Sequence, residues 1–252
     1  GSENMSAWDI FVQQFVAREG YLTVLQGLLN TVIIAVFGLL IGFVLGSIFA
    51  VIKTVPTYKN PVAIVLKRIV DIYVAVFRGT PVVVQLLIVH FILFPVMGVS
   101  IGSIIFSDSF AIQGVVIEAV ITFGLNSAAY ISEIMRGGIN SVDRGQLEAG
   151  RALGLSYPTA MVRIVVPQAI KNIVPTLGNE FIALIKETSV CGFISVLDLT
   201  RSFQNIANST YEFIVPYLML ALFYLVIVII ITLIIRAVER RFAKSDRRTS
   251  AK

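Results

Sequence analysis

Two long apolar runs set the main limit on what this chain can fold into. They cover residues 28–52 and 213–235, and each ends at a basic residue, Lys53 and Arg236 respectively. A helix needs about 20 mostly apolar residues to cross the hydrocarbon core of a bilayer. Only 14% of the 252 residues are charged, whereas soluble domains have about 25%. The chain lacks the polar surface of a water-soluble globule, so the sequence predicts a membrane protein.

Three further apolar runs contain polar side chains. They cover about 81–99, 110–134 and 170–196. The polar groups within them are Glu118, Asn126, Glu180, Lys186 and Glu187. Polar groups at membrane depth face protein or water rather than lipid, so we expect these three helices to form the interior. The predicted fold is therefore an all-α membrane protein with five transmembrane helices.

The distribution of basic residues predicts the orientation of these five helices. Of the 20 Lys and Arg residues, 17 lie between the first and second runs, between the third and fourth, or after the fifth. Arg18 and Arg201 are left for the opposite face, and Lys186 lies within a run. Because basic loops stay in the cytoplasm, we expect the N-terminus outside and the C-terminus inside.

The ends of the chain predict a simple domain organisation. Residues 1–20 begin with Gly1-Ser2, typical of a tag remnant, and continue as an amphipathic helix at the membrane interface. We expect one membrane domain over residues 21–241 and a basic cytoplasmic tail over residues 242–252 that meets anionic headgroups. Cys191 is the only cysteine, which excludes an intrachain disulfide.

Glycines recur at four-residue spacing in the first run. Gly38, Gly42 and Gly46 form a small-residue stripe that lets another helix approach closely. That helix belongs either to the same chain, which the spacing alone favours, or to a second subunit.

The loop between the third and fourth runs predicts a short helix over residues 143–154. Asp143 suits the N-cap, with Gln146 three residues later as in a capping box, and Gly154 suits a left-handed C-terminal cap. Glu148 has arginines four residues before it and three residues after it, which adds only weak support.

Small residues on this helix suggest a role. Ala149, Gly150 and Ala152 leave much of its surface almost without side chains, so another protein could approach its backbone. The alternatives are a docking helix and a surface helix that merely joins two spans.

Several motifs give the chain a resemblance to a known family. Glu148-Ala149-Gly150, Gly154 and Ile164-x-Val166-Pro167 have the spacing of the EAA signature, with Gly150 and Val166 departing from its usual Ala and Leu. The other matching segments are Arg78-Gly79-Thr80-Pro81, Ala129-Tyr130-x-x-Glu133-x-x-Arg136-Gly137-Gly138-Ile139, Gly145-Gln146, Pro167-Gln168-Ala169 and Lys186-Glu187-Thr188-Ser189. Together they resemble the permeases, or transmembrane subunits, of bacterial ABC importers in the polar amino acid uptake branch.

The resemblance implies a type I ABC importer permease for polar or charged amino acids, in the bacterial inner membrane, working by alternating access. Its partners would be two copies of an ATP-binding subunit, a second permease subunit forming a homodimer or a heterodimer, and an extracytoplasmic substrate-binding protein. The residues that would couple to the ATPase are Gln146, Glu148, Ala149, Gly150, Arg151, Ala152, Leu153 and Gly154. The sequence has no G-x-x-x-x-G-K-[ST] loop, so we expect a transport subunit that is not an enzyme and that holds no cofactor.

A polar cluster in the fourth run is the main candidate for substrate binding. Lys186, Glu187, Thr188 and Ser189 place a cation, an anion and two hydroxyls within about one turn of apolar sequence. We expect Lys186 to meet a substrate carboxylate, Glu187 an amine or a basic side chain, and the hydroxyls to orient it. The alternative is that the two charges pair with other helices and hold the bundle together.

Glu118 and Asn126 are further candidates, since eight residues, or about two turns, put them on one helix face. For each, a structural hydrogen bond between helices is an equal alternative. Arg78, Thr80 and Pro81 are expected to form a hinge or a charged inner rim, because Pro81 breaks the helix.

Two functions of other classes remain possible from the residues alone. An ion-coupled amino acid carrier would need no ATPase and would use Glu118, Glu187 and His90 as a proton relay. His90 is more often simply hydrogen-bonded in such a helix. A membrane-embedded enzyme would need a nucleophile or metal ligands near His90, and no such spacing is present.

Overall fold

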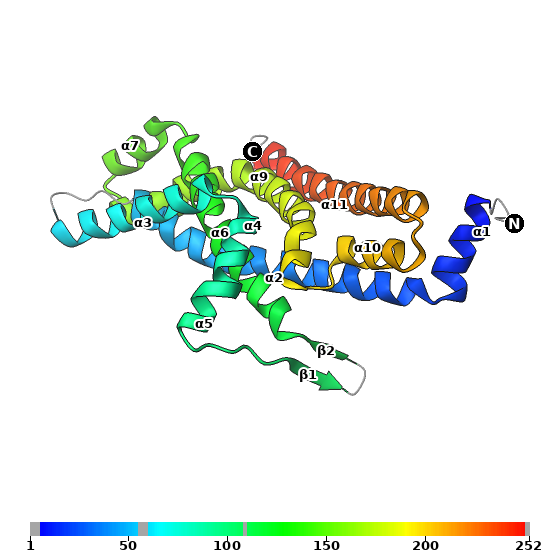
Figure 1. Ribbon diagram of the computed structural model, residues 1–252. Coiled ribbons are helices and arrows are strands. Elements are labelled where there is room, and N and C mark those ends of the chain that lie inside the picture. The colour runs from blue at the N-terminus through cyan, green and yellow to red at the C-terminus, as the bar shows by residue number, and fades with distance from the viewer. Residues whose placement is uncertain (1–5, 55–59, 108–109, 250–252) are drawn as a thin grey trace, which may run out of the picture. The chain divides into compact units, whose positions relative to one another are not determined.

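The computed structural model describes residues 6–54, 60–107 and 110–249. The expected tag remnant Gly1-Ser2 and the last three residues of the expected tail lie outside the described residues. Almost all of the regular structure is helical (Figure 1).

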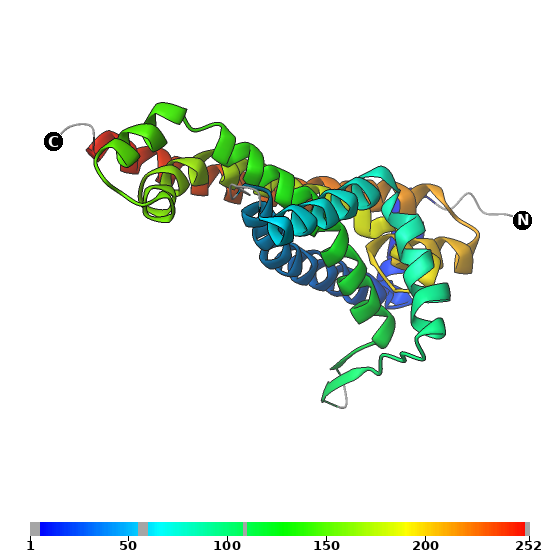
Figure 2. The same ribbon diagram turned by 90° about the vertical axis from the view of Figure 1, so that its left-hand side faces the viewer.

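Helices precede and follow one short pair of strands. The elements up to those strands are α1 (Ala7–Phe11), η1 (Val12–Ala17), α2 (Gly20–Thr54), α3 (Pro61–Gly79), α4 (Val82–Ile88), η2 (Val89–Leu93), α5 (Phe94–Val96), β1 (Ile104–Ser107) and β2 (Phe110–Ile112). The later elements are α6 (Gly114–Asn140), α7 (Arg144–Ala152), α8 (Tyr157–Ala160), η3 (Met161–Val165), α9 (Val166–Glu187), η4 (Thr188–Ile194), α10 (Leu199–Thr210) and α11 (Ile214–Thr249). Figure 2 shows the segment between α6 and α9, which contains α7 and α8.

Three described helices are long and apolar enough to cross a membrane by themselves. They are α2, α6 and residues Ile214–Arg241 of α11. The expected span over 81–99 passes the same test only when α4, η2 and α5 are taken together with α3. The expected span over 170–196 corresponds to α9 and η4, and α9 has the length but is not among the sufficiently apolar helices. The helical membrane architecture is confirmed, and the count of five spans stays a prediction.

A β-hairpin corrects the expected start of the span over 110–134. Strands β1 and β2 pair antiparallel, with Ile104 opposite Ile112, and α6 begins only at Gly114. The apolar residues that precede Gly114 therefore lengthen the apolar run in the sequence but belong to the hairpin rather than to the helix. An apolar sequence of three or four residues is equally compatible with a short strand, which explains the error.

Contacts divide the chain into two compact units. Unit 1 comprises residues 1–38, 81–123 and 184–229, and unit 2 comprises residues 39–80, 124–183 and 230–252. Helices α2, α6, α9 and α11 each contribute residues to both units.

In unit 1, the N-terminal helical segment packs on α10. Phe15 of η1 is buried with Val24 of α2 and with Phe203 and Ile206 of α10. Trp8, in contrast, is 69% exposed. The expected amphipathic segment therefore has one face in the protein core, while its position at a membrane interface stays a prediction.

In unit 2, the glycine stripe of α2 packs on α6. A Cβ atom on Gly42 would lie 2.5 Å from Cβ of Ser127, and one on Gly46 would lie 2.9 Å from the carbonyl oxygen of Ala128. Only a residue without a side chain allows this separation of the two backbones. The interpretation of the stripe as packing within the chain is confirmed at these two positions.

An ion-pair cluster joins α2, α3 and α6 in unit 2. Lys53 Nζ lies 2.6 Å from Glu133 Oε1 and 2.9 Å from Asp71 Oδ1. Arg136 Nη2 lies 2.6 Å from Glu133 Oε2. Lys53 and Glu133 are mostly buried, so these bonds are shielded from water and are stronger than exposed pairs.

We predict that Gly42→Ala destabilises the protein and that Gly137→Ala does not. The new methyl group at residue 42 would overlap Ser127, and such overpacking costs about 1–3 kcal/mol. Gly137 has no neighbour within 4 Å of an added Cβ, so alanine there gains helix propensity alone. Cys191, the single cysteine and buried, lets a thiol-reactive dye report thermal unfolding of the detergent-purified variants. Equal melting temperatures for the two variants would contradict this packing.

We also predict energetic coupling between Lys53 and Glu133. Lys53→Met and Glu133→Gln should each lower the stability by about 1–3 kcal/mol, because each removes one ion pair from a mostly buried cluster and leaves the remaining charge with one partner fewer. The double variant should lose less stability than the sum of the two single losses, with a coupling energy of about 0.5–3 kcal/mol. The control pairs Glu133→Gln with Arg68→Gln, at an exposed position of α3, and the stability losses of these two variants should add. If the losses of Lys53→Met and Glu133→Gln also added, the coupling would be excluded.

Candidate functional site

The predicted loop helix is present as α7, and its ends are formed by its own residues. Asp143 caps it by accepting a hydrogen bond from the backbone N–H of Gly145 at 2.6 Å. At the other end Gly154 has a φ of +85°. The N–H groups of Gly154 and Leu155 donate to the carbonyls of Arg151 and Gly150 at 3.0 and 3.2 Å. These two bonds are those of a Schellman motif, so the predicted C-terminal cap is confirmed.

Two predicted side-chain interactions of α7 are wrong. The side chain of Gln146 accepts a hydrogen bond from the side chain of Gln168 at 3.3 Å. Among the described residues it does not accept the bond from the backbone N–H of Asp143 that would complete a capping box. Within the part of the chain that the structure describes, Glu148 forms no ion pair with Arg144 or Arg151. Exposed pairs of this kind contribute only a few tenths of a kcal/mol, too little to hold three flexible side chains in place.

The two faces of α7 differ in what they contact. Gly150 is buried, and a Cβ on it would lie 2.7 Å from Cδ1 of Ile164 in η3. This contact explains why glycine stands where the family signature usually has alanine. The other coupling candidates, Glu148, Ala149, Arg151, Ala152, Leu153 and Gly154, are all exposed. The Leu153 side chain is 84% exposed, so a large apolar group faces away from its own chain beside charged residues.

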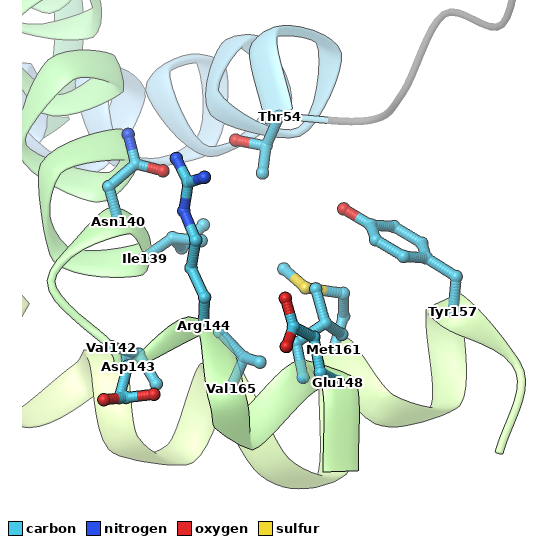
Figure 3. Close-up of a pocket in the computed structure, with 11 residues that line it drawn as sticks. Thr54, Ile139, Asn140, Val142, Asp143, Arg144, Glu148, Tyr157, Met161 and Val165 are labelled. Atoms are coloured by element: carbon cyan, nitrogen blue, oxygen red, sulfur yellow. The ribbon is translucent and has the colours of Figure 1, made fainter. Parts of the chain in front are cut away.

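A cavity of about 270 Å³ lies beside α7 in unit 2. Figure 3 shows Arg144 and Tyr157 on opposite sides of it, with Thr54 of α2 above and Glu148 and Met161 below. The cavity leaves part of α7 without a packing partner from its own chain.

The predicted hinge at Arg78, Thr80 and Pro81 coincides with the break between α3 and α4. Thr80 and Pro81 both have extended backbones, and the Thr80 hydroxyl donates to the Val76 carbonyl at 2.8 Å. The Arg78 guanidinium lies 5.5 Å from the ring centre of Tyr130, and its Nη1 lies 3.9 Å from Glu133 Oε2. Arg78 thus borders the ion-pair cluster, and its role in a charged inner rim stays a prediction.

The four residues of the predicted substrate cluster have different surroundings. Lys186 and Glu187, at the end of α9, are exposed. Thr188 is fully buried and donates to the Ile185 carbonyl at 2.8 Å. Ser189 lines a separate cavity beside α10. The structure therefore brings Ser189 to a cavity and places Thr188 in the protein interior.

Glu118 contacts His90. Its Oε2 lies 2.5 Å from Nδ1 of His90, which is in the π-helical η2. The side chains are 12% and 25% exposed, so the pair is largely shielded. This is the structural hydrogen bond that the sequence left as an alternative for both residues.

Asn126 and Glu180 also bond to neighbouring helices of unit 2. Asn126 Nδ2 donates to the Phe77 carbonyl of α3 at 3.5 Å. Glu180 Oε1 accepts from the Ser127 hydroxyl of α6 at 3.4 Å. Glu118 and Asn126 thus bond to different elements, η2 and α3 respectively.

Sequence reasoning missed the ion-pair cluster as a unit. In the sequence Lys53 marks only the end of the first apolar run, and nothing near Asp71 indicates Lys53 as its partner. The available signal was Glu133 with Arg136 three residues later, close to the end of an apolar helix. Among the described residues, no group of three His, Cys, Asp or Glu side chains could hold a metal ion.

The chain has close relatives among known transport proteins. It is 40% identical over 223 residues to the arginine transport system permease protein ArtQ of Bacillus subtilis (strain 168), covering 88% of this chain and 94% of the relative. It is 34% identical to the L-cystine transport system permease protein TcyB of the same organism, covering 93% and 90%.

Solved structures and a family model agree with these relatives. The crystal structure of an amino acid ABC transporter with histidines matches with a TM-score of 0.76 and 34% identity, covering 90% of this chain and 98% of that one. The MetNI methionine ABC transporter shares the fold, with a TM-score of 0.61 and 20% identity over 87% of this chain and 94% of that one. A family model described as "Binding-protein-dependent transport system inner membrane component" matches residues 42–244. The chain therefore belongs to this family, the permease components of ABC importers, as its EAA-like motif indicated.

Proposed function

We propose that this chain is the transmembrane permease subunit of an ATP-driven importer of polar or charged amino acids. Its family and its apolar helices make it a multi-pass inner membrane protein. The observation that supports the proposal best is α7, a self-capped helix that presents an exposed face of small residues and Leu153. A helix that merely joined two spans would need neither two caps nor an exposed leucine.

In this proposal α7 is the contact with the ATPase. The exposed residues Glu148, Ala149 and Leu153 sit in a groove of an ATP-binding subunit, and two permease subunits bring two such helices together. The second permease subunit is either another copy of this chain or a similar protein. ATP is bound by the partner chains, and this chain holds no cofactor of its own.

The substrate is delivered by an extracytoplasmic binding protein and crosses by alternating access. Lys186 and Glu187 are exposed charges at the end of α9, and charges at membrane depth face water or protein rather than lipid. They therefore suit the wall of a polar path, with Thr188 and Ser189 beside them and with Glu118 and Asn126 as further candidates. Arg78, Thr80 and Pro81 supply a break at which the path can open. The N-terminus lies outside and the C-terminus in the cytoplasm.

A second candidate function follows from the contact between His90 and Glu118. A shielded histidine–carboxylate pair can exchange a proton, which suits an ion-coupled carrier. The two functions differ in their energy source. Uptake into proteoliposomes that follows a proton or sodium gradient without nucleotide would favour the carrier, and strict dependence on internal ATP and the ATPase subunit would exclude it.

We predict that Leu153→Asp disrupts coupling while the permease stays folded. Leu153 is 84% exposed within its own chain, so its replacement costs little fold stability, whereas loss of an interface anchor costs about 2 kcal/mol, or roughly 30-fold in affinity. The readouts are affinity for the purified ATPase subunit and ATP-driven amino acid uptake in proteoliposomes. Val62→Asp, also at an exposed apolar residue but on α3, is the matched control. Wild-type affinity and uptake in the Leu153 variant would refute this docking surface.

We further predict that Gly154→Asp uncouples ATP hydrolysis from uptake. Its φ of +85° is unfavourable for a residue with a side chain, so the last turn of α7 should rearrange. The protein should remain in the membrane and hydrolyse ATP with its partner, but the substrate-loaded binding protein should no longer stimulate hydrolysis. Retained stimulation at the wild-type level would count against a role for this turn.

A further inference from the structure

A second cavity, of about 290 Å³, lies beside the start of α10 in unit 1. Its lining includes Ser189, Gly192, Asp198, Thr200, Arg201 and Gln204. Phe193 adds an apolar wall, so the cavity combines polar groups with an apolar surface, and it shares Ser189 with the polar run at the end of α9. Arg201 supplies the positive charge of this cavity. The distribution of basic residues in the sequence predicts only that Arg201 lies on the outer face.

Arg201 has no ion-pair partner within the described residues. Its Nη1 donates to the amide oxygen of Gln204 at 3.2 Å, and among the described residues this is the only hydrogen bond of its guanidinium. A guanidinium is always charged and has five N–H donors. Most of its donors, and its full charge, are thus available to a molecule in the cavity.

The acid in the same cavity does not neutralise Arg201. Asp198 is fully buried, and its carboxylate caps α10. Oδ2 accepts from the backbone N–H of Thr200 at 2.9 Å, and Oδ1 accepts from the backbone N–H of Arg201 at 3.2 Å. Both carboxylate oxygens are therefore engaged with the backbone rather than with the guanidinium.

The two faces of α10 show where the cavity lies in the fold. Leu199, Phe203 and Ile206 are buried against residues of α2 and α11, two helices long enough to span a membrane. The less buried face carries Arg201 and Gln204, with Asn205 and Asn208 more exposed. A helix packed on two spans with a polar outer face must turn that face toward water or protein, because lipid cannot satisfy it.

We propose that Arg201 binds the α-carboxylate of the transported amino acid in this cavity, with Ser189 and Gln204 as neutral hydrogen-bonding groups. A guanidinium matches a carboxylate through two parallel N–H···O bonds, which a lysine cannot form. Lys186, exposed in the preceding turn, then contributes a general positive field. Because every amino acid carries the same α-carboxylate, this site binds the group that all the substrates share. The inference rests on the proposed function and adds a binding residue to it.

The test measures direct binding to the permease–ATPase complex without the binding protein, so that recognition by that protein does not enter. Radiolabelled L-arginine, L-histidine and L-glutamine are the probes, and agmatine and histamine, which lack the carboxylate, are competitors. Wild type should bind an amino acid and be displaced by it, but not by its decarboxylated analogue. Arg201→Gln should weaken binding about tenfold to a hundredfold, the effect of losing a charge-assisted pair, and Arg201→Lys should recover only part of it.

Arg18→Gln is the matched control, because Arg18 is the other arginine expected on the outer face and is exposed. It should bind like wild type. Unchanged binding in Arg201→Gln, or equal competition by agmatine and L-arginine, would overturn the inference. Displacement by short-chain phosphatidylglycerol with no dependence on amino acids would assign the guanidinium to a lipid headgroup and would also overturn it. A wild-type complex that imports amino acids with ATP but shows no carboxylate-dependent binding would refute the inference alone, whereas absence of ATP-driven import would refute the proposed function.

Discussion

The structure depends on how charges are compensated in helices that otherwise contain apolar residues. An isolated charge at membrane depth costs several kcal/mol, so it survives only beside an opposite charge, a polar partner or water. Lys53 meets two carboxylates, and Glu133 meets both Lys53 and Arg136. Glu118 meets His90. These bonds fix which helix faces are adjacent, because moving one helix by a turn would strand several charges at once.

Features that depend on the local chain could be predicted from the sequence. The caps of α7 follow from the short side chain of Asp143 and from the freedom of Gly154 to adopt a positive φ. The break before α4 follows from Pro81, which cannot continue a helix. The glycine stripe predicted close helix packing, since only a missing side chain brings two backbones together. In each case the chemistry of the residue itself restricts the backbone conformation or the helix separation.

Features that depend on the choice between distant partners could not be predicted. Lys53 and Glu133 are separated by 80 residues, and nothing local distinguishes Lys53 from other basic residues at the ends of spans. Gln146 had a plausible partner in Asp143, yet Gln168 of α9 competes for its side chain. The predicted substrate cluster shows the same limit, because residues adjacent in sequence on one turn point in different directions. Thr188 is buried while Lys186 and Glu187 are exposed.

The geometry of α7 ties this short helix closely to the segment that follows it in its own chain. Leu153 projects away from the chain, whereas Gly150 is wedged against Ile164 and Gln146 is bonded to Gln168. Because α7 has its own caps, it moves as one rigid piece, and close-packed contacts transmit displacement rather than absorb it. Any shift of α7 must therefore be followed by η3 and by the first turn of α9.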